Sequence, residues 1–252
     1  MTGAVNSKTF FVSDVHLGAP ALHNNRQRER LFTDWLAMIR HQAGALFLLG
    51  DLFDCWFEYR RVIPKGFIRP LAKIAEIADA GIPVHFFTGN HDGWTFDYLE
   101  QELGLTVHRH EWRTTIGSKK FLLAHGDGLN PTDKGYLLMK KVFSNRFAQW
   151  GFKTLLHPDA GLYLAHKLSK KSRLSKPSEP FKNTDEETYR YALKVLDTEQ
   201  IDYFVFGHRH LMFDIPVGAH ARLINLGDWF NFYSYGVFDG VNLELKQYYT
   251  NE

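Results

Sequence analysis

Five short stretches of this chain place side chains that can bind metals or move protons directly after an apolar run. They are "FFVSDVHLG" with Asp14 and His16, "LFLLGDLFD" with Asp51 and Asp54, "HFFTGNHD" with Asn90, His91 and Asp92, "FLLAHGDG" with His125 and Asp127, and "FVFGHRH" with His208 and His210. A lone histidine after a strand is usually a hydrogen-bonded structural residue. Five such groups together would carry a large desolvation cost unless something pairs them, which indicates a shared functional site.

Metal ions are the partner that this set of side chains fits. Seven donors supply oxygen and nitrogen atoms and no thiolate: Asp14, His16, Asp51, Asn90, His125, His208 and His210. That mixture suits Mn²⁺, Fe or Zn²⁺, whereas a calcium site would use oxygen atoms throughout. Seven donors are too many for one tetrahedral zinc, but two metals that share a carboxylate would use them all. The set therefore predicts a two-metal site of the kind used in phosphoester chemistry.

The elements that must position these residues alternate along the chain. The apolar runs at residues 10–12, 46–49, 84–87, 121–123 and 203–206 are short and bounded by turn residues, as buried strands are. Helical patterns lie between the early runs, with one face formed by Leu31, Trp35, Met38 and Ile39 and another by Leu71, Ile74, Ala75 and Ala78. The alternation predicts an α/β fold, whose active site lies beyond the carboxyl ends of the strands. The tail, with Asp239-Gly240 as a hairpin signal, predicts a second sheet or an extension of the first.

Composition limits the class of protein. The 252 residues are 44% hydrophobic and 23% charged, which is typical of a globular protein and fits one large domain over residues 1–252. No apolar run is long enough to span a bilayer, and the first fourteen residues do not show the pattern of a signal peptide. A single cysteine, Cys55, cannot form an internal disulfide, so we expect a reducing cytoplasm.

The five blocks, in their order, resemble the motifs of the calcineurin-like metallophosphoesterases. The resemblance rests on Asp14-x-His16, Gly50-Asp51-x-x-Asp54, Gly89-Asn90-His91-Asp92, His125-Gly126-Asp127 and Gly207-His208-x-His210. It implies a central two-sheet β-sandwich flanked by helices, a four-layer arrangement of the α/β class. It also implies a ligand set: Asp14, His16 and His210 for the first metal, Asn90, His125 and His208 for the second, and Asp51 as the bridge.

The resemblance assigns roles to the neighbouring polar residues as well. His91 would lie near the phosphoryl oxygens without binding metal, where it can donate a hydrogen bond or protonate the leaving oxygen. Asp92 would support His91, while Asp54 and Asp127 would orient ligands or cap a turn. The two metals would withdraw charge from the phosphoryl group and lower the pKa of a water that bridges them, giving a hydroxide for in-line attack.

The segment 130–190 lies between two metal-bearing strands and is predicted to be a helical cap. Residues 140–182 contain ten Lys/Arg and two acidic residues, a net charge of +8, whereas the rest of the chain carries −6. Apolar residues recur there at helical spacing: Met139, Phe143, Phe147 and Trp150, then Leu164 and Leu168. A basic, apolar cap suits an acylated and phosphorylated substrate, although a solvated surface with packed apolar residues is the alternative. The candidate phosphate or headgroup contacts are Lys140, Arg146, Lys167 and Arg173, and the candidate lining of an acyl slot is Phe53 and Trp56.

Within the family, "SDVHLGAP", "LLGDLFDCWFEYR" and "FGHRHL", with the long insertion before the last, resemble one branch. That branch is the UDP-2,3-diacylglucosamine pyrophosphohydrolases of lipid A biosynthesis, in their Bacteroidetes-type form. The resemblance implies an Mn²⁺-dependent enzyme, peripheral on the inner face of the cytoplasmic membrane, that attacks the α-phosphorus of UDP-2,3-diacylglucosamine. The products would be UMP and 2,3-diacylglucosamine 1-phosphate. The best-known members carry Arg where this chain has His91, a titratable donor in place of a fixed cation.

Three other interpretations stay open. The first is a phosphodiesterase or pyrophosphatase that acts on another nucleotide or nucleotide sugar. The second is a metallophosphoesterase-like scaffold that only binds, which is disfavoured because every ligand position is filled. The third is a nuclease, which ranks lowest because no long basic stripe lies outside the insertion, so no nucleic-acid partner is expected. Nothing in the sequence indicates the oligomeric state.

Overall fold

The structure is a computed structural model that describes residues 7–20, 22, 24–129, 131–175 and 180–250, with only the backbone for residues 168 and 170–175. In chain order its elements are β1 (Lys8–Val12), α1 (Asn25–Ile39), β2 (Ala43–Leu48), α2 (Ile68–Asp79), β3 (Val84–Phe87), α3 (Tyr98–Leu103), β4 (Thr106–His108), β5 (Trp112–Ile116), β6 (Lys119–Leu123), α4 (Lys134–Phe143), α5 (Arg146–Leu155), α6 (Pro158–Ser175), the 3₁₀ turn η1 (Asn183–Asp185), α7 (Glu187–Leu196), β7 (Tyr203–Phe206), β8 (Met212–Val217), β9 (Ala221–Leu226), β10 (Ser234–Phe238) and β11 (Leu243–Gln247).

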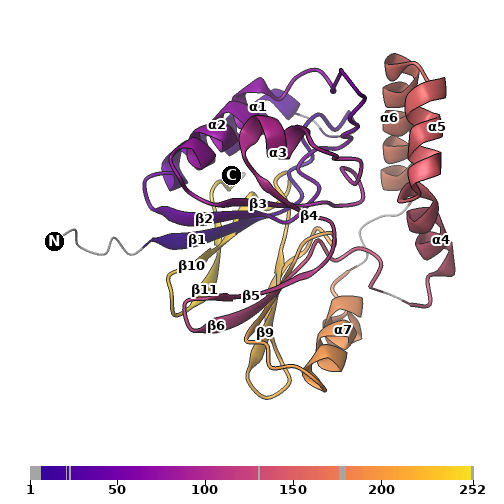
Figure 1. Ribbon diagram of the computed structural model, residues 1–252. Helices are drawn as coiled ribbons and strands as arrows, with labels where there is room; N and C mark the ends of the chain where they lie inside the picture. The colour runs from indigo at the N-terminus through magenta and orange to yellow at the C-terminus, as the bar shows by residue number, and fades with distance from the viewer. Residues whose placement is uncertain (1–6, 21, 23, 130, 176–179, 251–252) are drawn as a thin grey trace.

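Two mixed sheets face each other (Figure 1). The first has the strand order β11-β10-β1-β2-β3-β4, in which β1 to β4 run parallel and the tail adds two antiparallel strands. The second has the order β5-β6-β7-β9-β8, with β6, β7 and β9 parallel. Parallel strands end at the same edge, so the loops after β1, β2, β3, β6, β7 and β9 gather at one side of the sandwich.

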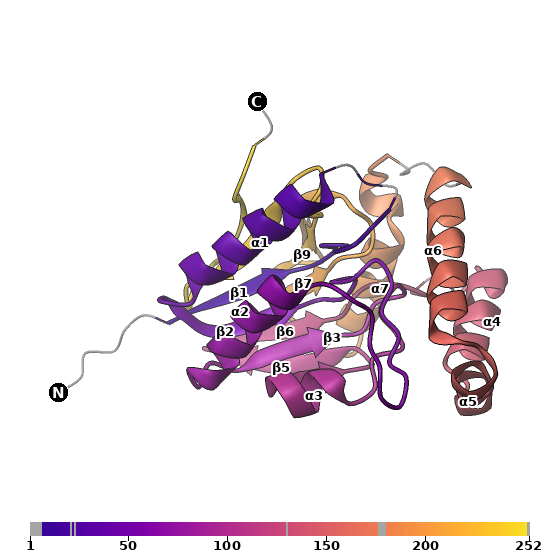
Figure 2. The same ribbon diagram turned by 90° about the horizontal axis from the view of Figure 1, so that it is seen from above.

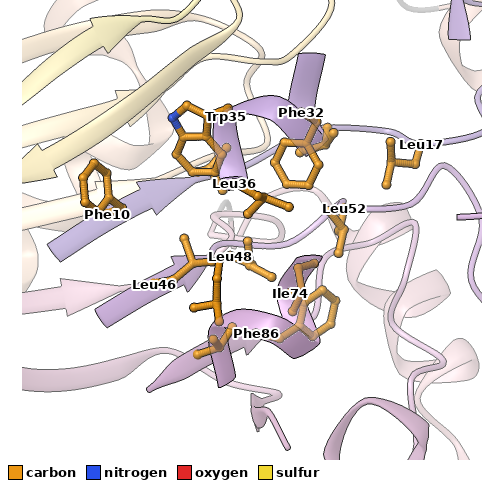
Figure 3. Close-up of a cluster of buried hydrophobic side chains, with 14 of the residues drawn as sticks. Phe10, Leu17, Phe32, Trp35, Leu36, Leu46, Leu48, Leu52, Ile74 and Phe86 are labelled. Atoms are coloured by element: carbon orange, nitrogen blue, oxygen red, sulfur yellow. The ribbon is translucent and has the colours of Figure 1, made fainter. Parts of the chain in front are cut away.

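Alternation along the strands builds the layers. In β1, Phe10 points to α1 and α2, while Phe11 points to the second sheet. Phe47 and Phe87 also lie in the cluster between the sheets, whereas Phe86 packs with the helices (Figure 3). A third cluster buries α7 against the second sheet. The order helix, sheet, sheet, helix confirms the predicted four-layer fold.

The helical cap stands beside the sandwich rather than within it (Figures 1 and 2). Its helices α4, α5 and α6 come between β6 and β7, and among the described residues α4 and α5 bury no side chain. The predicted insertion ended at residue 190, which falls inside α7. Because Ala192 and Val195 of α7 are buried on the second sheet, the cap ends with α6.

No helix in the described part of the chain is both long enough and apolar enough to cross a membrane.

Candidate metal centre

The loops after β1, β2, β3, β6 and β7 meet at one edge of the sandwich and bring potential ligands together. Each of three groups has its donor atoms within 4.8 Å of one another: Asp14, His16 and His210; Asp51, His125 and His208; and His16, Asp51 and His91. The members come from both sheets. The site therefore exists only because the two sheets face each other.

Asp14 shows most directly what the site is built to hold. Its Oδ2 accepts hydrogen bonds from the Ser13 hydroxyl at 2.6 Å and from the His208 amide at 2.8 Å. Its Oδ1 is buried and accepts no hydrogen bond from the described residues. Nδ1 of His210 lies 3.7 Å from this oxygen and is also buried without a hydrogen-bond partner among them. Buried polar atoms are rarely left unsatisfied, so an oxygen and a nitrogen that face each other in this state fit a bound cation.

Asp51 lies between the two groups of ligands. Its Oδ1 accepts a hydrogen bond from the His91 amide at 2.9 Å. Its Oδ2 is 3.6 Å from Nε2 of His16 and 3.4 Å from Nε2 of His125. One carboxylate oxygen thus faces an imidazole of each group, which is the placement that a bridging ligand requires.

The ring of His125 is held in the tautomer that a metal ligand needs. Its Nδ1 lies 2.8 Å from the carbonyl oxygen of Leu49, which can only accept, so Nδ1 carries the proton. Nε2 then faces Asp51 and lies 3.3 Å from the side-chain oxygen of Asn90. A histidine that donates one ring N–H to a carbonyl and turns its other nitrogen inward is the usual arrangement at a metal site.

Five of the seven predicted ligands adopt a left-handed backbone. Their φ angles are 55° at Asp14, 47° at His16, 52° at Asp51, 67° at His208 and 52° at His210. This region costs free energy for residues with a side chain, and such strain collects at functional sites. The fold therefore sets these side chains for a task other than packing.

Two glycines make room for the carboxylates. A Cβ at Gly89 would overlap Oδ1 of Asp51, and a Cβ at Gly207 would overlap both Ser13 Oγ and Asp14 Oδ2. Both glycines belong to the sequence blocks that the ligands define. Their small size lets the loops from the two sheets approach the same point.

The charges of the site depend on one another. Burial alone would raise the pKa of Asp51, but His125 and His91 outweigh burial and lower it well below its usual value. Burial alone would lower the pKa of His125, but Asp51 raises it well above the usual value. Burial lowers the pKa of His208 to about 4 and that of His210 to about 3. Ionised Asp51 with these two neutral imidazoles is the state that binds metal, and a cation would replace the proton on His125.

Comparison with known proteins identifies the family. Residues 7–212 match the family model described as calcineurin-like phosphoesterase. A UDP-2,3-diacylglucosamine hydrolase from Porphyromonas gingivalis is 39% identical over 96% of this chain and 98% of its own length. The chain belongs to the calcineurin-like phosphoesterase family. Membership makes it a metal-dependent hydrolase, and the scaffold that only binds is disfavoured.

A curated relative and a solved structure of lower identity also match most of this chain. A UDP-2,3-diacylglucosamine hydrolase from Shewanella piezotolerans is 28% identical over 94% of this chain and 97% of its own length. Among solved structures, the phosphoesterase Yfce from E. coli matches with a TM-score of 0.46 and 18% identity, covering 96% of this chain and 93% of that one.

His91 lies beside the ligand groups, with a donor atom within 4.8 Å of those of His16 and Asp51, but its ring has a different partner from the one expected. Its Nδ1 is 2.8 Å from the carbonyl oxygen of Asp54. The Asp92 carboxylate instead accepts hydrogen bonds from the amides of Gly89 at 2.7 Å and Leu52 at 2.8 Å. Burial, and next the charge of Asp51, raises the pKa of Asp92 to about 7. Asp92 therefore joins two backbone loops, and the ring of His91 has the Asp54 carbonyl as its hydrogen-bond partner instead. The catalytic role of Asp92 stays a prediction.

Phe53 and Trp56 were expected to line an acyl slot, and the structure contradicts this. Phe53 is fully buried and Trp56 is 2% exposed. Their rings stack on each other in the core with a centroid distance of 4.2 Å. The indole N–H of Trp56 donates a hydrogen bond to the Glu58 carboxylate at 2.8 Å. Aromatic residues of a loop and of a core look alike in sequence, and here the core holds both.

The basic residues proposed from the cap fall in different places. Lys140 lies beside the metal centre, where Nζ is 2.6 Å from Asp127, the residue two positions after His125. Arg146 and Lys167 are exposed on α5 and α6. The side chain of Arg173 lies outside the described part of the structure.

Two further residues touch the site and were missed from the sequence. Asp228, directly after β9, is buried with Oδ2 3.9 Å from Nδ1 of His210. "LINLGD" ends in Gly-Asp just as "LFLLGD" does, and this repeated pattern could have revealed it. Ser169 of α6 donates to Asp54 Oδ2 at 2.9 Å, and Asp54 Oδ1 is 3.5 Å from Nδ1 of His16. No sequence pattern pairs Ser169 with a residue 115 positions away.

Proposed function

We propose that this phosphoesterase hydrolyses the pyrophosphate bond of UDP-2,3-diacylglucosamine, giving 2,3-diacylglucosamine 1-phosphate and UMP. The observation that supports it most is the pairing of two ligand groups around Oδ2 of Asp51 in a chain that matches a UDP-2,3-diacylglucosamine hydrolase over 96% of its length. The ligand groups suit cleavage of a phosphoric anhydride, and the relative's name supplies the substrate.

Two divalent metals, with Mn²⁺ preferred and Fe or Zn²⁺ as alternatives, fit the donors. Asp14, His16 and His210 would hold one, and Asn90, His125 and His208 the other, with Asp51 shared. When bound, the metals withdraw charge from the phosphoryl oxygens and activate water as the nucleophile.

The protein's own groups do the remaining work. His91 keeps its Nδ1 proton on the Asp54 carbonyl, so Nε2 is the atom that can face the phosphoryl group. Nε2 donates a hydrogen bond, or acts as the acid for the leaving oxygen, only when the ring carries a second proton. Lys140, fixed by Asp127 beside the second ligand group, supplies a cation near the diphosphate. Arg146, Lys167 and Arg173 are proposed to meet phosphates or headgroups farther out on the cap.

The cap suits the acyl chains. Its exposed apolar side chains include Met139, Phe143, Phe147, Trp150 and Leu164, which are between 41% and 84% exposed. An acylated substrate stays in a bilayer, so we place the enzyme in the cytoplasm, peripheral on the inner face of the membrane.

Incubation with UDP-2,3-diacylglucosamine in detergent micelles and Mn²⁺ tests the proposal. We expect UMP to form and to be abolished by EDTA. Cleavage of an aryl phosphodiester or of another nucleotide sugar, without UMP from the lipid, would reject this substrate. The broader phosphoesterase activity would remain, and the His91 position would then be the first place to look for the difference.

A further inference from the structure

A second cationic surface lies outside the metal centre, in the loop between β2 and α2 and the first turn of α2. Residues 59–69, "YRRVIPKGFIR", are here called the basic loop. They contain Arg60, Arg61, Lys65 and Arg69 and no acidic residue. Sequence reasoning looked for basic residues in the cap and overlooked this shorter group.

The cations of the basic loop point into solvent. Arg60, Arg61 and Lys65 are exposed, and no ion pair of the described residues includes them. Arg69 alone is paired, with Glu29 at 3.6 Å. Three cations are therefore available to an external anion.

Apolar side chains stand among these cations. Ile68 is 77% exposed and Val62 is 48% exposed. They are not exposed through loose packing, because Pro64 is buried and the Phe67 ring packs on Phe53 with centroids 5.1 Å apart. The loop thus has a fixed base in the core and presents apolar and cationic groups together.

The basic loop adjoins the cap near the turn between α5 and α6. A Cβ at Gly161 of α6 would overlap the Tyr59 hydroxyl, so α6 touches the start of the loop. The cap exposes Leu155 and Tyr163 in this part, at 82% and 70%. In Figures 1 and 2 the loop between β2 and α2 approaches α5 and α6 from the side of the sandwich.

We propose that the basic loop docks on the surface of an anionic lipid bilayer. This rests on the proposed function, since an acylated substrate must be drawn from a membrane. Lipid phosphates complement the three unpaired cations, and Ile68 and Val62 enter the boundary between headgroups and acyl chains. The loop would hold the cap and the mouth of the metal centre against the bilayer. Each cation near an anionic surface contributes about five-fold to binding, so three contribute roughly a hundred-fold.

Sedimentation with lipid vesicles tests the docking surface. The variant Arg60→Gln/Arg61→Gln/Lys65→Gln is compared with the native chain on vesicles of phosphatidylcholine and on vesicles that also contain phosphatidylglycerol. We expect the variant to lose roughly a hundred-fold in binding to the anionic vesicles only. The matched control, Lys120→Gln/Lys194→Gln/Lys246→Gln, changes the net charge equally on exposed lysines of β6, α7 and β11 and should bind the vesicles like the native chain.

Ile68→Ser separates insertion from charge, because it should weaken binding to both kinds of vesicle. Native-like binding of the loop variant would overturn the proposal, and so would equal losses in the loop variant and the lysine control. UMP release in detergent micelles keeps the two proposals apart. The loop variant should retain UMP release in micelles. If it also binds vesicles like the native chain, the docking surface is rejected and the proposed substrate still stands. Absence of UMP from the native enzyme would reject the substrate.

Discussion

The sandwich and the cap are built on opposite rules. The sandwich buries its polar side chains, with Asp14 and His16 fully buried and Asp51 at 1% exposure. The cap exposes its apolar ones, with Phe147 at 84% and Leu155 at 82%. Burial fixes the ligands and raises the cost of leaving them unpaired, whereas exposure leaves apolar area for something outside the chain. The difference indicates that the chemistry and the recognition of an acylated substrate reside in separate parts.

All three helices of the cap contact the sandwich. The ring of Phe152 in the cap packs on two rings of the sandwich, with centroid distances of 4.7 Å to Phe57 and 4.9 Å to Trp94. Ser169 adds a buried hydrogen bond to Asp54, the carboxylate next to His16. The cap thus reaches the metal centre at two points, Ser169 on Asp54 and Lys140 on Asp127, and each point can be tested by substitution.

The largest effect is expected from Asp51→Ala, which breaks the sandwich side of the comparison. Removing the oxygen that faces both ligand groups should abolish metal binding at both and cost several kcal/mol of transition-state stabilisation. Hydrolysis of an aryl phosphodiester should fall by more than about a thousand-fold. Metal content by mass spectrometry and the melting temperature are measured alongside, with Asp159→Ala on the exposed cap as the control. Full activity of the metal-stripped variant would contradict the two-metal site.

Removal of the cap is expected to separate the two substrates. Replacing residues 140–182 by a short linker should leave cleavage of the aryl phosphodiester within about ten-fold, because all seven ligands remain. Cleavage of UDP-2,3-diacylglucosamine should fall by more than about a hundred-fold, because the apolar surface is lost. Initial rates on both substrates measure this. Equal losses on both would show that the cap serves the chemistry itself.

Ser169→Ala sharpens the comparison at the junction. Loss of the hydroxyl removes one hydrogen bond from Asp54, which lies against His16, so Mn²⁺ affinity should weaken by about ten-fold. Titration calorimetry with Mn²⁺ measures it without relying on turnover. Ser169→Thr should restore the affinity, and Ser144→Ala on the cap surface should not change it. If Ser169→Ala binds Mn²⁺ like the native protein, the junction is structural only.

The smallest effect is expected on the free energy of unfolding when an exposed apolar side chain of the cap is removed. Phe147→Ala should change the free energy of unfolding by less than about 0.5 kcal/mol, since its side chain is mostly in solvent. Phe86→Ala in the core should cost about 3–5 kcal/mol. Urea unfolding measures both. A cost above about 2 kcal/mol at Phe147 would show that the cap surface is packed in solution.

Sequence reasoning succeeded where a property repeats at short range. Each ligand follows an apolar run by two to four positions, and parallel strands bring such positions to one edge, so the clustering of these residues and the layers could be predicted. Sequence reasoning failed where a residue's partner depends on how distant loops meet in the folded protein. Asp54 and Asp92 are both acidic neighbours of ligand positions, and only the path of the loops decides which of them meets His91. Met38 was placed on the inner face of its helix, yet it is 40% exposed, while Phe32 and Leu36 are buried.

The hydrogen bond from the His208 amide to Asp14 has a consequence for biosynthesis. It joins positions 194 residues apart in the chain. At translation rates of about 5–20 residues per second, the Asp14 loop leaves the ribosome roughly 10–40 s before its partner exists. The metal centre is therefore among the last features to form, and ions cannot guide the early folding of the N-terminal sheet. A nascent chain that stops short of residue 208 would carry five of the seven predicted ligands and lack His208 and His210, so one member of each main ligand group would be missing.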